Sequence, residues 1–425
     1  MNKMGRFFVL AQNFALFFLC SALPGMAYDF GLVTRQNPEF TNTGENDSGE
    51  INYTGSYSPW VSSELGRTAN LYLSVKLSTV YEWGEWKPEN MPVLFEVGRF
   101  EVSWRPAFSI GPVSSIHVEA GRAPFHDPSG FIAAGLFDGF TGNAALGQAR
   151  ISAGALYTGL LYKETAEILM TPSDVETYAD TDNYFASRRL LFSGGAEFPA
   201  LTPHSSLTAN ALLQFDVNGQ DSNGSQDSNG SHTSLHTQYL TARYTYLALE
   251  TFSLTGTAVA GLAENQNGDV SAHLAAAAGA DWEVPGTLRD MLQGEIRWSS
   301  GAVNKNITAF APVTGIAQGQ VFSPNLSGLM IIKGKYTTRF HKDFSASAEG
   351  TYFIRTDGET LGGAEYLPSS ARLLGGEVYG ALSWAPASDF MATMGCGFFF
   401  PGMGNVFVSD APIRWKISVG LILSL

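Results

Sequence analysis

Apolar and polar residues alternate with a period of two along most of this chain. The pattern is clearest in residues 413–425, IRWKISVGLILSL, where every second position is apolar: Ile413, Trp415, Ile417, Val419, Leu421, Leu423 and Leu425. Arg414, Lys416, Ser418 and Gly420 stand between them. Because successive side chains of a β-strand point to opposite faces, this segment is predicted to be a strand with one apolar and one polar face.

Similar alternation recurs along the chain, separated by segments rich in turn-forming residues. It predicts eighteen strands, with sixteen as the alternative, near residues 28–35, 50–62, 69–82, 92–105, 113–122, 137–146, 149–163, 188–199, 206–217, 236–249, 252–264, 270–284, 290–301, 327–340, 343–356, 373–385, 389–400 and 413–425. Short connections such as 249–251, 341–343 and 385–388 alternate with long ones near 36–49, 164–187, 218–235, 302–326 and 357–372. This alternation is typical of an antiparallel up-and-down β-barrel with an even number of strands and both termini at the end with short turns.

The barrel is predicted to cross a membrane. After the N-terminal segment, the chain contains no run of 18 apolar residues, and only 15% of its residues are charged. A barrel wall needs no such run, because only every second residue of each strand contacts lipid. Residues 28–425 are therefore predicted to form a single all-β domain, a transmembrane barrel with long extracellular loops.

Residues 1–27 have the layout of a secretory signal peptide. Lys3 and Arg6 precede an apolar run over residues 7–19, and a segment of mostly small residues follows, up to Ala27. This layout predicts export and cleavage after Ala27. The alternative of a retained membrane helix is disfavoured because the run is shorter than the roughly 20 residues that a spanning helix needs.

Composition excludes several classes of function. A net charge of -14 argues against a nucleic-acid partner. After cleavage only Cys396 remains, so neither an intrachain disulfide nor a multi-cysteine metal site is expected. We identify no nucleotide, phosphate-loop or metal motif, and therefore predict no cofactor and no metal. His126 and Asp127 are the one adjacent histidine and carboxylate pair, but no nucleophile motif accompanies them, so the protein is predicted not to be an enzyme and to have no catalytic residues.

The polar faces of the strands are predicted to line the lumen of the barrel, and basic residues are in excess on them. The pore-lining basic residues are predicted to be Arg243, Arg297, Lys333, Lys335, Arg339, Arg355, Arg414 and Lys416. A basic wall in a narrow aqueous pore concentrates anions, which favours small polar or anionic solutes. The alternative is that these cations only form ion pairs with Glu295, Glu349 and Glu377.

Residues 122–136, RAPFHDPSGFIAAGL, are predicted to form a loop that constricts the pore. The segment combines turn formers with an apolar tail that has no evident place in water. Its constriction residues are predicted to be Arg122, Phe125, His126 and Asp127. The alternative is a loop packed over the rim of the barrel.

Three stretches resemble the alginate-export-like outer-membrane porins of Gram-negative bacteria and spirochaetes. They are VEAGRAPFHDPSGFIAAGLFDGF (118–140), NLSGLMIIKGKYTTRF (325–340) and LLGGEVYGALSWAPASDFMATMGCGFFFPG (373–402). The resemblance implies an eighteen-stranded monomeric barrel whose arginine-rich, electropositive pore conducts an anionic polysaccharide. The last strand also resembles the C-terminal strand that the barrel-assembly machinery reads in outer-membrane proteins, although here it ends in Leu425 rather than Phe.

Together these observations predict an outer-membrane porin for the passive passage of small hydrophilic solutes, including anionic ones, or of an acidic polysaccharide. Its expected partners are outer-membrane lipid, the barrel-assembly machinery and the solute itself. One alternative is a surface-exposed adhesin or antigen, whose polar outer loops include the repeat at 221–231. Another is a fatty-acid-type transporter, which would need a more apolar interior and an N-terminal plug.

Overall fold

A computed structural model of the chain describes residues 28–42, 49–82, 85–87, 93–107, 111–218, 234–286, 288–303, 307–358, 366–367 and 370–425. The expected signal peptide and the repeat at 221–231 lie outside these residues.

The strands are β1 (Tyr28–Asn42), β2 (Glu50–Leu65), β3 (Ala69–Glu82), β4 (Glu85–Lys87), β5 (Leu94–Trp104), β6 (Val113–His126), β7 (Ala134–Leu146), β8 (Ala149–Tyr157), β9 (Arg189–Thr202), β10 (Ser205–Asp216), β11 (Leu235–Leu249), β12 (Phe252–Asn265), β13 (Val270–Val284), β14 (Asp290–Ser299), β15 (Leu329–His341), β16 (Phe344–Arg355), β17 (Leu373–Ala387), β18 (Phe390–Phe400) and β19 (Arg414–Ser424). The helices are α2 (Lys163–Ala166), α3 (Pro172–Ala179) and the 3-10 helix η2 (Pro401–Met403). Among the described residues, none of the helices has the length and apolar character needed to cross a membrane.

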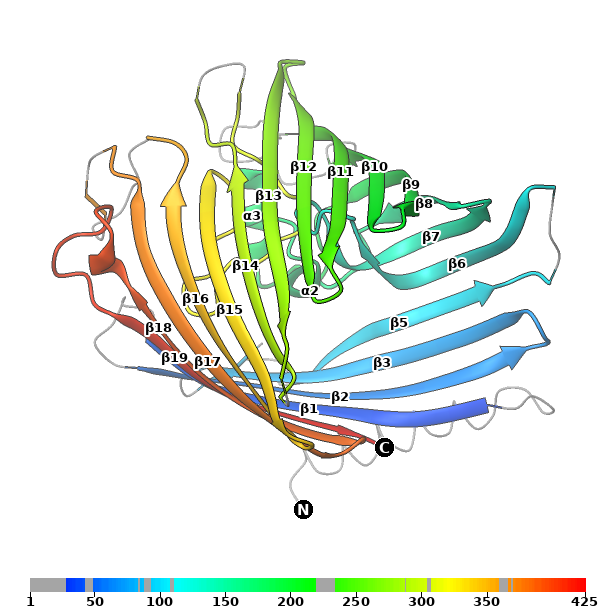
Figure 1. Cartoon of the computed structure of the whole chain (residues 1–425), viewed down its shortest axis with the longest axis horizontal. Coiled ribbons are helices and arrows are strands. Elements are labelled where there is room, and N and C mark those ends of the chain that lie inside the picture. The colour runs from blue at the N-terminus through cyan, green and yellow to red at the C-terminus, as the bar shows by residue number, and fades with distance from the viewer. Residues whose placement is uncertain are drawn as a thin grey trace.

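All strands belong to one antiparallel sheet that closes on itself. Each long strand pairs with its neighbours in the chain, and β1 pairs with β19 to complete the ring (Figure 1). The sheet has nineteen strands, but β4 has only three residues and pairs with β3 alone, so eighteen strands form the wall. The predicted eighteen-stranded up-and-down barrel is therefore confirmed.

The two ends of the barrel differ in the length of their connections. Turns of two or three residues join β2 to β3, β7 to β8, β9 to β10, β11 to β12, β15 to β16 and β17 to β18, all at one end. The connections over residues 158–188 and 300–328 lie at the other end. We call these the short-turn end and the long-connection end. Strands β1 and β19 begin and end, respectively, at the short-turn end, as predicted.

The outer face of the wall is apolar and uncovered. Leu240, Ile296, Ile332, Val378 and Phe398 point outward, and between 42% and 64% of each side chain is exposed. In β15 the exposed Ile332 is followed by Lys333 on the inner face, which repeats the alternation seen in the sequence. A belt of this kind is what a wall in contact with lipid shows.

Some strands extend beyond the predicted bounds. The first strand was predicted to end at residue 35, and a loop was predicted over 36–49, but β1 continues to Asn42. Pro38 has no N–H group, yet it does not interrupt the strand, because the pairing between β1 and β19 omits positions 37 and 38. Likewise β6 continues to His126 and β7 begins at Ala134. The predicted loop 122–136 is thus mostly a hairpin, and its connection is only residues 127–133.

The connection after β8 contains helices rather than an open loop. The strand predicted over 149–163 ends at Tyr157, and α2 and α3 follow within the predicted loop 164–187. Helix α3 begins at a capping box, in which the Thr171 side chain accepts from the Asp174 N–H and the Asp174 side chain accepts from the Thr171 N–H. The Arg189 side chain, fully buried, binds the carboxylates of Asp174 and Asp216 and ties α3 to the wall.

The hydrophobic core lies inside the barrel, at the long-connection end. Inward-facing strand residues such as Leu212 and Phe353 pack there against three connections that fold inward, 127–133, 158–188 and 300–328. These connections contribute Phe131, Ile132, Leu161, Ile168, Phe310 and Val313. Backbone hydrogen bonds join them: the Val313 N–H donates to the Ile132 carbonyl at 2.7 Å, and the Gly315 N–H donates to the Glu167 carbonyl at 2.9 Å. The three connections therefore form one internal layer.

Candidate functional site

The hairpin of β6 and β7 leaves the wall and enters the lumen. Strands β5 and β6 pair only where Phe100–Trp104 faces Val118–Arg122, although both strands continue beyond this point. The bend is at Gly121, which has a φ of +119° and where a Cβ atom would lie 2.1 Å from the Phe100 carbonyl oxygen. Only glycine fits such a close approach at positive φ. The far end of the hairpin, residues 127–133, therefore crosses the interior, and we call it the hairpin tip.

Two of the predicted constriction residues hold this tip in place. The Arg122 guanidinium donates two hydrogen bonds of 2.8 Å to Asp138, one to the Val97 carbonyl of β5 and one to the Leu160 carbonyl. One carboxylate oxygen of Asp127 accepts from the Ile132 and Ala133 N–H groups at 2.9 Å. Both side chains are buried, so they shape the tip rather than contact a passing solute.

The other two predicted constriction residues differ from each other in environment. Phe125 packs edge-on against Phe137 with the ring centres 5.7 Å apart. His126 is exposed at the end of β6. The structure thus brings all four residues to one end of the hairpin. The tip residues that contact the rest of the lumen are Pro128, Ser129 and Phe131, none of which was predicted as a constriction residue.

Below the tip lies a cavity of about 250 Å³, which we call the basic cavity. Ser129 and Phe131 of the tip form one side. The inner faces of β11 to β15 form the other side and contribute four cations: Arg243, Arg297, Lys333 and Lys335. Four of the eight predicted pore-lining cations are therefore gathered in one place.

The basic cavity has an excess of positive charge. Its lining includes two carboxylates, Asp281 and Glu295, against the four cations, which leaves a net charge of +2. Glu295 pairs with Arg297 at 2.9 Å, and Lys333 pairs with Glu349 at 3.0 Å. Neither Arg243 nor Lys335 forms an ion pair with any residue that the structure describes. The predicted alternative of mutual pairing thus holds for Arg297 and Lys333 but not for these two.

Two inward-folding connections orient the arginines of the basic cavity. The Arg297 guanidinium lies over the ring of Phe131, 5.5 Å from its centre, and donates to the Gln318 side chain at 3.0 Å. Arg243 donates to the Pro128 carbonyl at 3.3 Å. Guanidinium groups held in this way present fixed donors to an anion, which flexible side chains do not.

The other four predicted cations lie elsewhere in the barrel. Arg339 is exposed at the short-turn end and donates to the Lys342 carbonyl. Arg355 pairs with Asp357 at 2.5 Å, and Lys416 pairs with Glu39 at 3.0 Å. Arg414 lies over the rings of Phe322, Phe399 and Phe407. These four residues are not part of the basic cavity.

Among the described residues, Glu377 binds backbone N–H groups rather than a cation. Its carboxylate accepts hydrogen bonds from the N–H groups of Gln320, Val321 and Phe322 at 2.7 to 3.0 Å. The predicted ion pairing of Glu377 is therefore wrong. Its negative charge instead holds the connection 300–328 inside the lumen, because it satisfies three N–H groups that have no strand partner.

A second cavity of about 440 Å³ flanks the tip on the side of β6 to β10. Pro128 lines it, together with Arg150 and Glu197, whose charged groups are 3.6 Å apart. Since these two charges balance, this side of the lumen lacks the positive excess of the basic cavity. Among the described residues, no group of three or more histidine, cysteine or carboxylate side chains is arranged to hold a metal ion.

Comparison with known proteins gives a likeness in structure alone. No protein-family model matches the chain, and no curated protein sequence matches it. OpdK of Pseudomonas aeruginosa, solved with vanillate, superposes with a TM-score of 0.59 at 11% identity, covering 93% of this chain and 99% of that one. OccK2 (OpdF) of the same organism, solved with glucuronate, gives 0.59 at 10% identity, over 94% and 98% of the two chains. P. aeruginosa OprD gives 0.55 at 12% identity, over 93% and 95%. The barrel thus has the fold of the OprD and Occ outer-membrane porins, while the resemblance to the alginate-export-like family stays a prediction.

Proposed function

We propose that this protein is an outer-membrane porin that passes small hydrophilic solutes and favours anionic ones. The observation that carries the proposal is the basic cavity, where Arg243 and Lys335 lie in the lumen without carboxylate partners among the described residues. A net positive charge inside a narrow, low-dielectric wall raises the local concentration of anions.

The structural neighbours support a carboxylate as the solute. OpdK was solved with vanillate and OccK2 with glucuronate, and both have this fold. A carboxylate accepts bidentate hydrogen bonds from guanidinium groups, of which Arg243 and Arg297 supply two in the basic cavity. The cavity, at about 250 Å³, has room for a small carboxylate solute.

The same proposal includes the cellular setting. The signal peptide over residues 1–27 would direct export, the apolar outer face would contact outer-membrane lipid, and the alternating β19 would engage the barrel-assembly machinery. The proposal assigns no catalysis, because the adjacent pair His126 and Asp127 is divided between an exposed ring and a carboxylate that shapes the hairpin tip.

Ion selectivity in a planar bilayer tests the function. The refolded protein is inserted under a tenfold gradient of potassium chloride, and the reversal potential is measured. We expect discrete openings and a reversal potential of the sign that chloride preference gives. Adding glucuronate or vanillate should block the current at lower concentration than the matching neutral compounds do. Cation preference would refute the anionic proposal, and folded barrels that conduct no current would refute the porin itself.

A further inference from the structure

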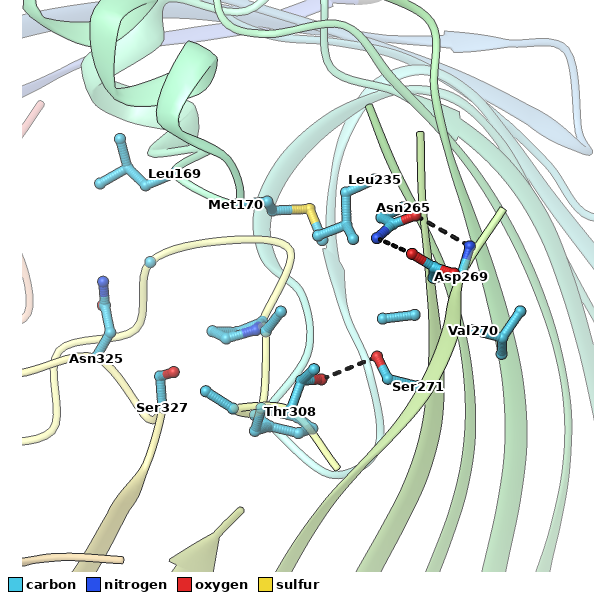
Figure 2. Close-up of a pocket in the computed structure, with 16 residues that line it drawn as sticks. Leu169, Met170, Leu235, Asn265, Asp269, Val270, Ser271, Thr308, Asn325 and Ser327 are labelled. Carbon is cyan, nitrogen blue, oxygen red and sulfur yellow. Dashed lines mark hydrogen bonds between the residues drawn. The ribbon is translucent and has the colours of Figure 1, made fainter. Parts of the chain in front are cut away.

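A third cavity, of about 800 Å³, lies at the long-connection end, and the proposed anion pathway does not use it. We call it the outer cavity. Its walls come from the connection between α2 and α3, from the turn between β12 and β13, and from residues 308–327 (Figure 2). Leu169, Met170, Asn265, Asp269, Val270, Ser271, Thr308, Asn325 and Ser327 are among its lining residues.

The outer cavity differs from the basic cavity in its chemistry. Among the described residues that line it there is no lysine, arginine or histidine, and the Asp269 carboxylate is the one charged group. An anion would therefore lack a counter-charge there. Hydroxyl and amide groups alternate with apolar surfaces such as Met170, Leu235 and Pro312. In Figure 2, Met170 and Leu235 lie beside the polar pair Asn265 and Asp269.

Hydrogen bonds hold the polar side of the outer cavity in place. The Asn265 side chain accepts hydrogen bonds from the backbone N–H groups of Asn267 and Asp269, both at 3.0 Å, and fixes the turn. Ser271 and Thr308 share a hydrogen bond of 3.4 Å between their hydroxyl groups, and the Thr308 N–H donates to the Ala272 carbonyl at 3.0 Å. A ligand would thus meet polar groups that are already in place, which lowers the entropy cost of binding.

Several polar groups remain open for a ligand. The side chains of Asn325 and Ser327 have no hydrogen-bond partner among the described residues. Asp269 uses one carboxylate oxygen to accept from Asn265 at 3.4 Å, and its other oxygen has no partner in the described structure. Together these groups offer both donors and acceptors, as paired hydroxyl groups of a ligand require.

The outer and basic cavities are separate sites. Along β13 they are lined by Ser271 and Ala277, six residues apart, which corresponds to ~20 Å of strand. Phe310 closes the space between them. Its ring packs on His273 and Tyr239, with ring centres 5.3 and 6.3 Å away, and the Tyr239 hydroxyl donates to the Ala311 carbonyl at 2.5 Å. Ligand in one cavity therefore does not occupy the other.

We propose that the outer cavity binds an uncharged, hydroxyl-bearing ring compound the size of one or two sugar rings. Such a molecule presents hydroxyl groups at its edge and C–H groups on its faces, which match the polar groups near Asp269, Asn325 and Ser327 and the apolar groups near Met170 and Leu235. The volume lies in the usual range for small-molecule sites. The proposal goes beyond the anion pathway and does not depend on it.

Calorimetry on the full refolded barrel in detergent tests the site. The probes are glucose, galactose, N-acetylglucosamine, myo-inositol and maltose, with glucuronate as the charged counterpart of glucose. We expect at least one neutral probe to bind with a dissociation constant on the order of 1–10 mM. Replacing exposed Ser327 with tryptophan fills the cavity and should weaken that binding at least tenfold. Asn267→Ala changes a residue of the turn between β12 and β13 that does not line the cavity, so this variant should bind the probe as the native protein does.

The outcomes are separable from those of the porin proposal. If none of the neutral probes binds, or if binding persists in Ser327→Trp, the outer cavity is not a sugar site. Heat-modifiable migration on a gel reports whether each variant is folded. If Ser327→Trp does not fold, Asn325→Leu replaces it as the variant that should weaken binding. Ser327→Trp should keep the native reversal potential, since its change lies outside the basic cavity. Stronger binding of glucuronate than of glucose would contradict the absence of a counter-charge.

Discussion

Replacing Lys335 with glutamate should largely abolish the anion preference of the channel. The substitution changes the net charge of the basic cavity from +2 to zero. Lys335 has no ion-pair partner among the described residues, because its cross-strand neighbour Glu349 pairs with Lys333 instead. Its side chain is partly exposed to the lumen, so the change is expected to alter conduction more than stability.

The size of the effect follows from Coulomb's law. A unit charge ~7 Å from a passing monovalent ion contributes ~0.6 kcal/mol in water, and 0.1 M salt screens about half of it. A change of two charge units then shifts the free energy of an anion by ~0.6 kcal/mol in one direction and that of a cation by the same amount in the other. The permeability ratio should therefore fall by roughly eightfold, at 1.4 kcal/mol for each factor of ten.

The measurement is the reversal potential at 0.1 M mean salt, compared between Lys335→Glu and the native protein. Lys342→Glu is the matched control, because it makes the same charge change at an exposed site at the short-turn end, where 80% of the side chain is accessible. The salt dependence should match the screening, with a smaller effect at 1 M. An unchanged reversal potential in folded Lys335→Glu, or an equal shift in Lys342→Glu, would refute the role of the basic cavity.

Three further predictions concern the inward-folding connections. Glu377→Gln removes the charge that binds three N–H groups, so it should weaken the docking of connection 300–328 by about 2–4 kcal/mol and increase its cleavage by protease and the noise of the open channel. Gly121→Ala places a Cβ atom 2.1 Å from a carbonyl oxygen of β5 at positive φ and should sharply lower the yield of heat-modifiable barrel, whereas Gly142→Ala, whose nearest contact would be 3.9 Å, should fold normally. Burial raises the pKa of the Glu167 carboxyl, because it favours the protonated form. The protonated carboxyl therefore contributes fully to stability below its ordinary pKa, and this contribution is lost as pH rises through the raised pKa. Protease sensitivity of residues 158–188 should therefore increase over that range in the native protein and stay flat in Glu167→Gln; equal pH profiles would contradict this.

The wall of the barrel was predictable because its physics is local. A side chain in a strand faces either lipid or lumen, so the alternation around Ile332 and Lys333 reports its own environment. Strand ends were harder to predict. Pro38 alone predicts the end of a strand, because proline lacks an N–H group. Only the pairing of β1 with both β2 and β19 shows that the missing N–H falls where the hydrogen bonding to β19 is interrupted.

The candidate site was only half predictable, because it depends on contacts between distant segments. The period of two places Arg243, Lys335, Arg355 and Arg414 on the inner face alike. It does not show that the ring of Phe131 packs against Arg297, or that the rings around Phe322 pack against Arg414. These partners lie on connections whose paths follow from tertiary packing, and no local pattern encodes such paths.

The internal layer also limits how this barrel can be engineered. If each connection were an independent module, one could be exchanged without the others. Here the hairpin tip, connection 158–188 and connection 300–328 share one core. Backbone hydrogen bonds join Ile132 to Val313 and Glu167 to Gly315. A chimera that exchanges one of them would leave the others facing a mismatched surface. The three should therefore be transplanted as a set, and substitutions in one should show epistasis with substitutions in the other two.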